Sequence, residues 1–188
     1  MIPKSHTKNR SWHRAAAGLC IGLLSALLSL PGHAQAGGLE DGLRKVGEAR
    51  LRVFLWSIYD SRLYTPSGRY DERERPLRLE IDYLIDVRGE ALVKRTSQEW
   101  EAMGRSHPRE AAWLERLQAL LPDIHKGDVL SLEIDEKEHS TFYFNGERLG
   151  RVDDPAFGQQ FLDIWVSEDT TRPELRQALL GSMSDEGN

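Results

Sequence analysis

The chain is 188 residues long and carries 25 Lys and Arg against 30 Asp and Glu, a formal net charge of −5 at pH 7. This acidic balance makes nucleic acid a poor partner. The single cysteine, Cys20, lies in an N-terminal apolar run, so the rest of the chain has no disulfide, thiolate metal ligand or cysteine nucleophile.

Residues 1–36 have the three-part pattern of a cleavable secretory signal peptide. Four Lys and Arg precede the apolar run at 15–30, and Ala34-Gln35-Ala36 supplies the small side chains of a cleavage site. A helix needs about 20 apolar residues to span a bilayer, and the apolar run is shorter than that. This disfavours the alternative of an uncleaved membrane anchor. We therefore expect cleavage after Ala36 and export to the periplasm.

Cleavage changes the charge of the protein and leaves one domain. Four of the 25 basic residues and none of the 30 acidic residues precede residue 37, so the mature chain has 21 basic residues and a net charge of −9. Anionic membrane surfaces are poor partners for such a chain.

We expect a single domain at 37–181, a frayed tail at 182–188 and no integral membrane segment after cleavage.

The first half of the domain alternates apolar and polar residues with the period of a β-strand. A strand at 49–55 places Leu51, Val53 and Leu55 on one face, and 58–65 continues extended to a Pro-Ser-Gly turn. Two strands or one bent strand both fit this segment. The clearest alternation runs over 77–85. It predicts an antiparallel strand with one face in water.

Two helices interrupt the strands. Residues 89–103 carry an apolar helical stripe that also includes Thr96 and Glu99. A second helix follows, with Ser106 as its predicted N-cap and Pro122 as its stop.

Strands and helices also make up the last third of the domain. Alternation at 129–135 and 141–152 predicts strands, and Asn145-Gly146 predicts a hairpin turn. Asp154-Pro155 begins one helix, and a capping box at Thr171 begins another. Strands that return after a helix pair predict an α+β fold, with an antiparallel sheet covered by helices on one face.

The domain contains no motif that holds a metal or a cofactor. Its three histidines, His107, His125 and His139, are not spaced as metal ligands, and the acidic residues before His139 lack the pattern of a calcium loop. A glycine-rich phosphate loop, a dinucleotide fingerprint and a Gly-x-Ser-x-Gly elbow are also missing. We predict no cofactor and no metal site, and identify no catalytic residue.

Aromatic residues are concentrated on elements that must pack together. Trp56, Tyr59 and Tyr64 crowd one segment. Others lie on the later elements: Tyr83, Trp100, Trp113, Tyr143 and Trp165. Such side chains either build the core, their more frequent role, or line a pocket for an apolar ligand whose polar head group they orient.

Several blocks of the domain resemble the bacterial chalcone isomerase-like family. The opening signature is Val46-Gly47-Glu48-Ala49-Arg50-Leu51, followed by Trp56-Ser57-Ile58-Tyr59-Asp60-Ser61-Arg62-Leu63-Tyr64. Blocks within 142–150, 154–165 and 170–181 agree with the family in order and spacing.

The resemblance implies the chalcone isomerase fold, a large antiparallel sheet with a layer of helices on one face and a ligand cleft between them. The plant relatives divide into isomerases, which close a flavonoid ring by intramolecular addition, and fatty-acid-binding proteins, which hold the carboxylate with an arginine and a tyrosine. Function within such a fold depends on the site.

The resemblance also carries over individual residues. Tyr64 ends the opening signature, and Tyr59, five positions before it, stands where the isomerases have threonine and the fatty-acid binders have tyrosine. Arg50 follows Gly47 as the partnering arginine does. Because positions 50 and 59 differ in parity, only a bulge or turn near Trp56-Ser57 would bring both to one side of a strand. The candidate ligand-binding residues are therefore Arg50, Tyr59 and Tyr64.

Three functions follow from these observations. The leading hypothesis is a periplasmic, non-catalytic protein that binds a fatty acid or similar apolar carboxylate, with Tyr59 donating a hydrogen bond and Arg50 supplying charge. The first alternative is an isomerase or lyase for a small phenolic or enone substrate, in which an arginine stabilises an oxyanion. The second is a scaffold or partner-binding module whose cleft is closed by Trp100 and Trp113.

Overall fold

The computed structural model describes residues 42–181, which form one sheet and four helices. The expected signal peptide at 1–36 and the tail at 182–188 lie outside the described residues. Within 42–181, no helix is long and apolar enough to cross a membrane.

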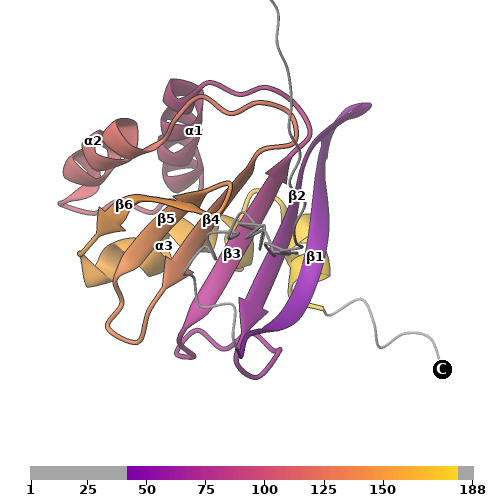
Figure 1. The fold of residues 1–188 in the computed structure, drawn as a ribbon, viewed down its shortest axis with the longest axis vertical. Helices are drawn as coiled ribbons and strands as arrows, with labels where there is room; N and C mark the ends of the chain where they lie inside the picture. The colour runs from indigo at the N-terminus through magenta and orange to yellow at the C-terminus, as the bar shows by residue number, and fades with distance from the viewer. Residues whose placement is uncertain (1–41, 182–188) are drawn as a thin grey trace, which may run out of the picture. The chain divides into compact units, whose positions relative to one another are not determined.

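The sheet has six antiparallel strands in the order of the chain (Figure 1). They are β1 (Arg44–Val53), β2 (Trp56–Thr65), β3 (Leu77–Tyr83), β4 (Val129–Ile134), β5 (Ser140–Phe144) and β6 (Glu147–Val152). Each strand pairs with its neighbours in sequence, so β1 and β6 form the two edges. The predicted antiparallel sheet is confirmed.

The turn between β1 and β2 differs from the sequence prediction. Leu55 was predicted to share a strand face with Leu51, and this is wrong. Val53 pairs with Trp56, so the chain reverses at Phe54 and Leu55. Leu55 is 97% exposed. Alternation alone cannot tell the end of a strand from an apolar turn.

The β5–β6 turn follows the sequence prediction. Asn145 and Gly146 have φ values of 51° and 82°. Both residue types tolerate the left-handed region, which matches the twist of a two-residue hairpin. Asn145 Oδ1 also accepts a hydrogen bond from the Val129 amide at 2.8 Å, which ties the turn to the start of β4.

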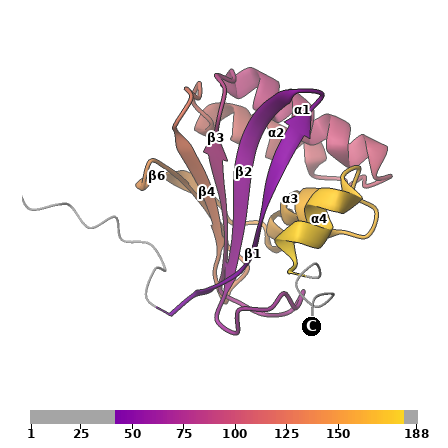
Figure 2. The same ribbon diagram turned by 90° about the vertical axis from the view of Figure 1, so that its right-hand side faces the viewer.

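Four helices cover one face of the sheet (Figure 2). Helices α1 (Gly89–Ala102) and α2 (Glu110–Leu120) connect β3 to β4, whereas α3 (Pro155–Val166) and α4 (Pro173–Leu179) follow β6. The α+β architecture with a one-sided helical layer agrees with the sequence prediction.

The starts of α2 and α3 were predicted with different success. Asp154 caps α3 and accepts a hydrogen bond from the Ala156 amide at 3.1 Å, as predicted. For α2 the N-cap is Arg109 rather than Ser106. The Glu110 amide donates to the His107 carbonyl oxygen, so a separate turn precedes the helix.

The start of α4 also differs from the prediction, for a tertiary reason. Its N-cap is Arg172, and no side chain caps it. The Thr171 hydroxyl, predicted to cap the helix, instead donates to Glu99 Oε2 on α1 at 2.6 Å. A hydrogen bond to a charged group is stronger than a bond to a neutral backbone amide, so the distant partner replaces the local one.

Most aromatic side chains build the core. Phe157, Phe161 and Trp165 follow one face of α3, and the ring of Phe161 lies 5.4 Å from that of Phe142 on β5. Trp100 and Trp113 are 0% and 3% exposed and belong to the same core. The interpretation that these two tryptophans close a cleft is therefore wrong.

Helix α4 packs directly on β1 at Gly47. A Cβ atom at this position would lie 2.5 Å from the Leu179 carbonyl oxygen, so only glycine permits the approach. This contact holds the C-terminal end of α4 against β1, at the edge of the sheet.

Candidate ligand-binding cavity

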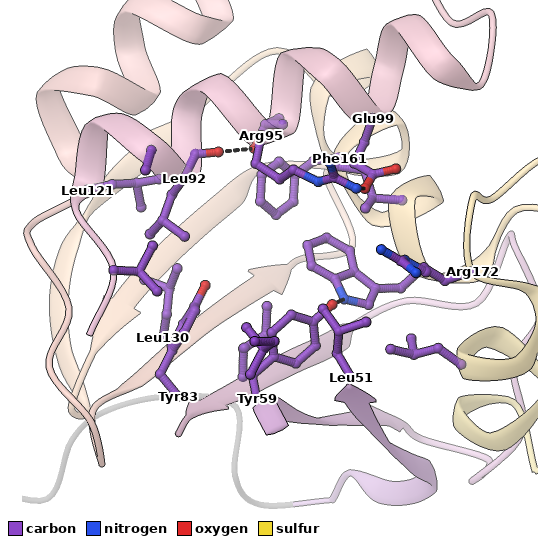
Figure 3. Close-up of a pocket in the computed structure, with 18 of the residues that line it drawn as sticks. Leu51, Tyr59, Tyr83, Leu92, Arg95, Glu99, Leu121, Leu130, Phe161 and Arg172 are labelled. Atoms are coloured by element: carbon purple, nitrogen blue, oxygen red, sulfur yellow. Dashed lines mark hydrogen bonds and ion pairs between the residues drawn. The ribbon is translucent and has the colours of Figure 1, made fainter. Parts of the chain in front are cut away.

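A cavity of about 430 Å³ lies between the sheet and the helices α1, α3 and α4 (Figure 3). Most of its wall is aliphatic or aromatic. The side chains with a charge or a hydroxyl are Tyr59, Tyr83, Arg95, Thr96, Glu99 and Arg172. The volume falls in the range of about 300–1,000 Å³ that is typical of small-molecule sites. The cavity therefore suits an apolar ligand with few polar groups.

Tyr59 lies on β2 at the centre of the sheet wall. It pairs with Leu51 on β1 and Tyr83 on β3, and all three line the cavity. Its hydroxyl oxygen accepts a hydrogen bond from Trp165 Nε1 at 3.0 Å. Because the indole N–H can only donate, the tyrosine keeps its own proton for another acceptor.

Burial keeps Tyr59 in its protonated form. Removal from water raises the pKa of Tyr59 to about 12, while the Trp165 hydrogen bond and the charges of Arg172 and Arg95 lower it by less. A phenol with this pKa is neutral across the physiological range. Tyr59 is therefore a hydrogen-bond donor to whatever occupies the cavity.

Tyr83 supplies a second hydroxyl. Its ring meets that of Tyr59 edge to face, with centroids 6.0 Å apart. Figure 3 shows the Tyr83 hydroxyl directed toward the cavity, and it makes no hydrogen bond with any other described residue. Burial raises the pKa of Tyr83 as well, so this hydroxyl also stays protonated.

Arg172 brings an unpaired positive charge to the wall. It directly precedes Pro173 of α4, and in Figure 3 its side chain lies on the same side of the cavity as Tyr59. Within residues 42–181, its guanidinium group takes part in no ion pair or hydrogen bond. A cation in this state is available to an anionic ligand group.

Among the described residues of the wall, Glu99 on α1 is the only acidic one, and its carboxylate already has partners. It forms an ion pair with Arg95 one turn earlier and accepts the hydrogen bond from Thr171. Thr96 is satisfied too, since its hydroxyl donates to the Leu92 carbonyl oxygen at 3.0 Å. Arg95 is thus neutralised, and Arg172 leaves the wall with one uncompensated positive charge.

Of the three predicted site residues, the structure brings only Tyr59 to the cavity. Arg50 pairs with Asp60 across the strands, with Nε to Oδ1 at 2.6 Å and Nη2 to Oδ2 at 2.7 Å. Because neighbours along a strand point to opposite faces, Arg50 lies on the face opposite Leu51 and Tyr59. The ladder does shift register between Leu51 and Arg52, but after Arg50, so the shift does not turn Arg50 inward.

Tyr64 also lies away from the cavity. It borders a smaller depression of about 190 Å³ together with Leu43, Arg78 and Glu80. Tyr59 and Tyr64 are an odd number of residues apart in one strand and therefore face opposite sides of the sheet.

Sequence reasoning missed the charged groups of the site. Thr96 and Glu99 did carry a signal, because polar residues on the apolar stripe of a helix need partners in the interior. Arg172 stood in a block that carried the family resemblance, but nothing local indicated where its side chain would point. Within the described part of the chain, no group of three or more His, Cys, Asp or Glu side chains could hold a metal ion.

Comparisons with known proteins agree with this architecture. The family model described as chalcone isomerase-like matches residues 33–181. An uncharacterized protein of Haemophilus influenzae is 29% identical over 136 residues, which cover 72% of this chain and 67% of that protein. The crystal structure of a fatty-acid binding protein of Arabidopsis thaliana has a similar fold, with a TM-score of 0.60 and 12% identity, covering 77% of this chain and 90% of that one. By its family match over most of its length and by its fold, the chain belongs to the chalcone isomerase-like family.

Proposed function

We propose that this protein binds a fatty acid or similar apolar carboxylate in the cavity without chemically changing it. Tyr59 donates a hydrogen bond to the carboxylate, and Arg172 supplies the opposite charge. The apolar wall accepts the hydrocarbon chain. Arg172 replaces Arg50 in this proposal, because Arg50 is engaged by Asp60 on the other face of the sheet.

The observation that carries the proposal is the pairing of a free donor with a free cation. Tyr59 accepts from Trp165 and so keeps its proton available, and Arg172 has no counter-charge within residues 42–181. A carboxylate that leaves water for an apolar cavity needs both a hydrogen bond and a positive charge to offset its desolvation. The structural relative described as a fatty-acid binding protein supports the same ligand class.

The expected signal peptide places this binding in the periplasm in our proposal. Apolar acids dissolve poorly in water, and a carrier in an aqueous compartment between membranes would keep them dispersed. N-terminal sequencing of the protein recovered from a periplasmic extract tests the location. A mature chain that begins at Gly37 is expected, and recovery of the full-length chain in the cytoplasm would contradict it.

The proposal can be tested with two tyrosine variants. Lipids extracted from protein purified from its native host are expected to contain a fatty acid by mass spectrometry. Tyr59→Phe removes one hydrogen bond to a charged group and is expected to weaken fatty-acid binding about tenfold or more. Tyr64→Phe is the matched control, because Tyr64 lies away from the cavity, and its affinity is expected to stay within about twofold. If the two variants bind the fatty acid with equal affinity, Tyr59 does not donate a hydrogen bond to the carboxylate.

The isomerase alternative draws on the same two groups. A phenol donor and an unpaired guanidinium are also what a developing oxyanion requires. Turnover of a chalcone or another enone that is lost in Arg172→Ala would favour catalysis. Binding of fatty acid without turnover of such substrates favours the carrier.

A further inference from the structure

The turn between β1 and β2 exposes three consecutive large apolar side chains. Phe54 is 96% exposed, Leu55 97% and Trp56 71%, and they are the large hydrophobic residues of the described chain that are exposed. Single exposed apolar residues are ordinary, whereas a contiguous group marks a site of interaction. The turn stands clear of the helices at the end of β1 and β2 in Figure 1.

Backbone geometry does not explain these residues. Two-residue hairpin turns favour Asn and Gly, and the β5–β6 turn of this protein uses both. Phe54 instead adopts a φ of 54°, in the left-handed region that bulky side chains disfavour. The sequence of this turn is therefore unfavourable both for its backbone and for its contact with water, which points to a partner for its side chains.

The exposed turn lies beside the cavity. Val53 and Ile58, on either side of the three exposed residues, line the cavity wall. A partner that covers the turn would therefore lie close to the cavity.

We propose that Phe54, Leu55 and Trp56 insert into a lipid bilayer and bring the cavity next to the lipid. A stable contact with another protein needs about 800 Å² from each partner, which a turn of two residues cannot supply. Lipid needs no complementary surface, and Trp is enriched where a bilayer meets water. This inference goes beyond the proposed ligand and does not require that the ligand is a carboxylate.

Insertion of the turn does not depend on anionic lipid. The mature chain has an expected net charge of −9, so attraction between charges would not hold it on an anionic membrane. Apolar burial of the turn works equally in neutral phosphatidylcholine. The proposal therefore predicts binding to neutral vesicles that added phosphatidylglycerol does not strengthen.

Tryptophan fluorescence can test the insertion at a single position. Trp12 lies in the expected signal peptide, and Trp100, Trp113 and Trp165 are already buried. In the mature chain, a blue shift on adding phosphatidylcholine vesicles therefore reports on Trp56. The shift is expected for the native protein and should disappear in Trp56→Phe. All variants are prepared as the mature chain that begins at Gly37, checked by mass spectrometry, because the apolar run at 15–30 would itself bind lipid.

Vesicle sedimentation then compares variants of two turns. Phe54→Ser combined with Leu55→Ser is expected to weaken binding to phosphatidylcholine vesicles at least about tenfold, because it removes two apolar side chains from the lipid. Glu136→Ser combined with Lys137→Ser, in the exposed β4–β5 turn, is the control and should bind as the native protein does. Unchanged thermal unfolding in both variants shows that the fold is kept.

Two results would overturn the proposal. The first is a native protein that does not sediment with neutral vesicles, or that binds equally well after the double Ser substitution. The second is a native dimer in light scattering that becomes a monomer in the same variant, because the turn would then join two copies of this chain. Neither result depends on whether the cavity binds a fatty acid, which the Tyr59 variant tests separately.

Discussion

Trp165 on α3 donates its indole N–H to the Tyr59 hydroxyl on β2 over 3.0 Å, across 106 residues of sequence. The bond joins the helical layer to the sheet inside the cavity. In this bond the Tyr59 hydroxyl is the acceptor, because an indole N–H can only donate a hydrogen bond. A buried tyrosine that accepts from one side is left with a donor for the ligand side.

The first prediction separates the two candidate arginines. Arg172→Ala removes the uncompensated charge of the cavity wall and is expected to weaken fatty-acid binding about 10- to 100-fold. Arg50→Ala, the matched control, removes a guanidinium that is engaged by Asp60 on the other face, so its affinity should change less than about twofold. Displacement of a fluorescent fatty acid measures both. If Arg50→Ala loses more fatty-acid affinity than Arg172→Ala, then Arg50 and not Arg172 supplies the charge for the carboxylate.

The second prediction is a gain of affinity. Glu99→Gln removes the counter-charge of Arg95 but keeps the shape of the side chain, so a second cation becomes available to the ligand. We expect fatty-acid binding to strengthen several-fold, while the affinity for the corresponding alcohol stays unchanged. Glu101→Gln on the exposed side of α1 is the control and should change neither affinity. If Glu99→Gln weakens binding of the acid, the ligand does not carry a negative charge at this end.

The third prediction concerns stability at alkaline pH. Burial raises the pKa of Tyr59 to about 12. A tyrosine in the unfolded chain has a lower pKa, of about 10. Between these values the unfolded chain loses a proton that the folded protein keeps. The free energy of unfolding should therefore be insensitive to this group below pH 10 and fall as the pH rises toward 12.

Urea denaturation at pH 9, 10 and 11 measures this effect. Tyr59→Phe removes one of the two buried phenols of the cavity, so its stability should fall less steeply above pH 10 than that of the native protein. Tyr83 contributes in the same direction, since burial raises its pKa too. Parallel pH profiles for the native protein and the variant would show that Tyr59 is solvated.

The fourth prediction tests the packing that holds α4. Gly47→Ala places a methyl group 2.5 Å from the backbone oxygen of Leu179, which can move only with the helix. We expect a loss of about 1–3 kcal/mol in the free energy of unfolding and weaker ligand binding, because Arg172 moves with α4.

Gly150→Ala is the control for the Gly47 variant. Its added methyl group would lie 2.4 Å from Leu120 Cδ2, the end of a flexible side chain that can change rotamer. The loss of stability should therefore be smaller and ligand binding unchanged. Equal effects of the two substitutions on binding would mean that α4 does not position the site.

The fold could be predicted in large part from the sequence. Alternation with period two gave the strands of an antiparallel sheet, and the Asn145-Gly146 turn and the Asp154 cap lie where local chemistry predicts them. The errors occur where an interaction with a distant segment replaced a local one. Thr171 bonds to Glu99 instead of capping α4, and its sequence neighbours carry no information about that partner.

The candidate site shows the same division. The sequence by itself determined that Arg50 and Tyr59 differ in parity, and hence that a regular strand points them to opposite faces. It also identified Tyr59 as a candidate donor through the family resemblance. Only the tertiary structure decided that Arg172 lies on the wall beside Tyr59, because this depends on how α4 packs against β1 at Gly47. Strand periodicity acts between near neighbours, whereas the charge of the cavity comes from segments that meet only when the helical layer closes on the sheet.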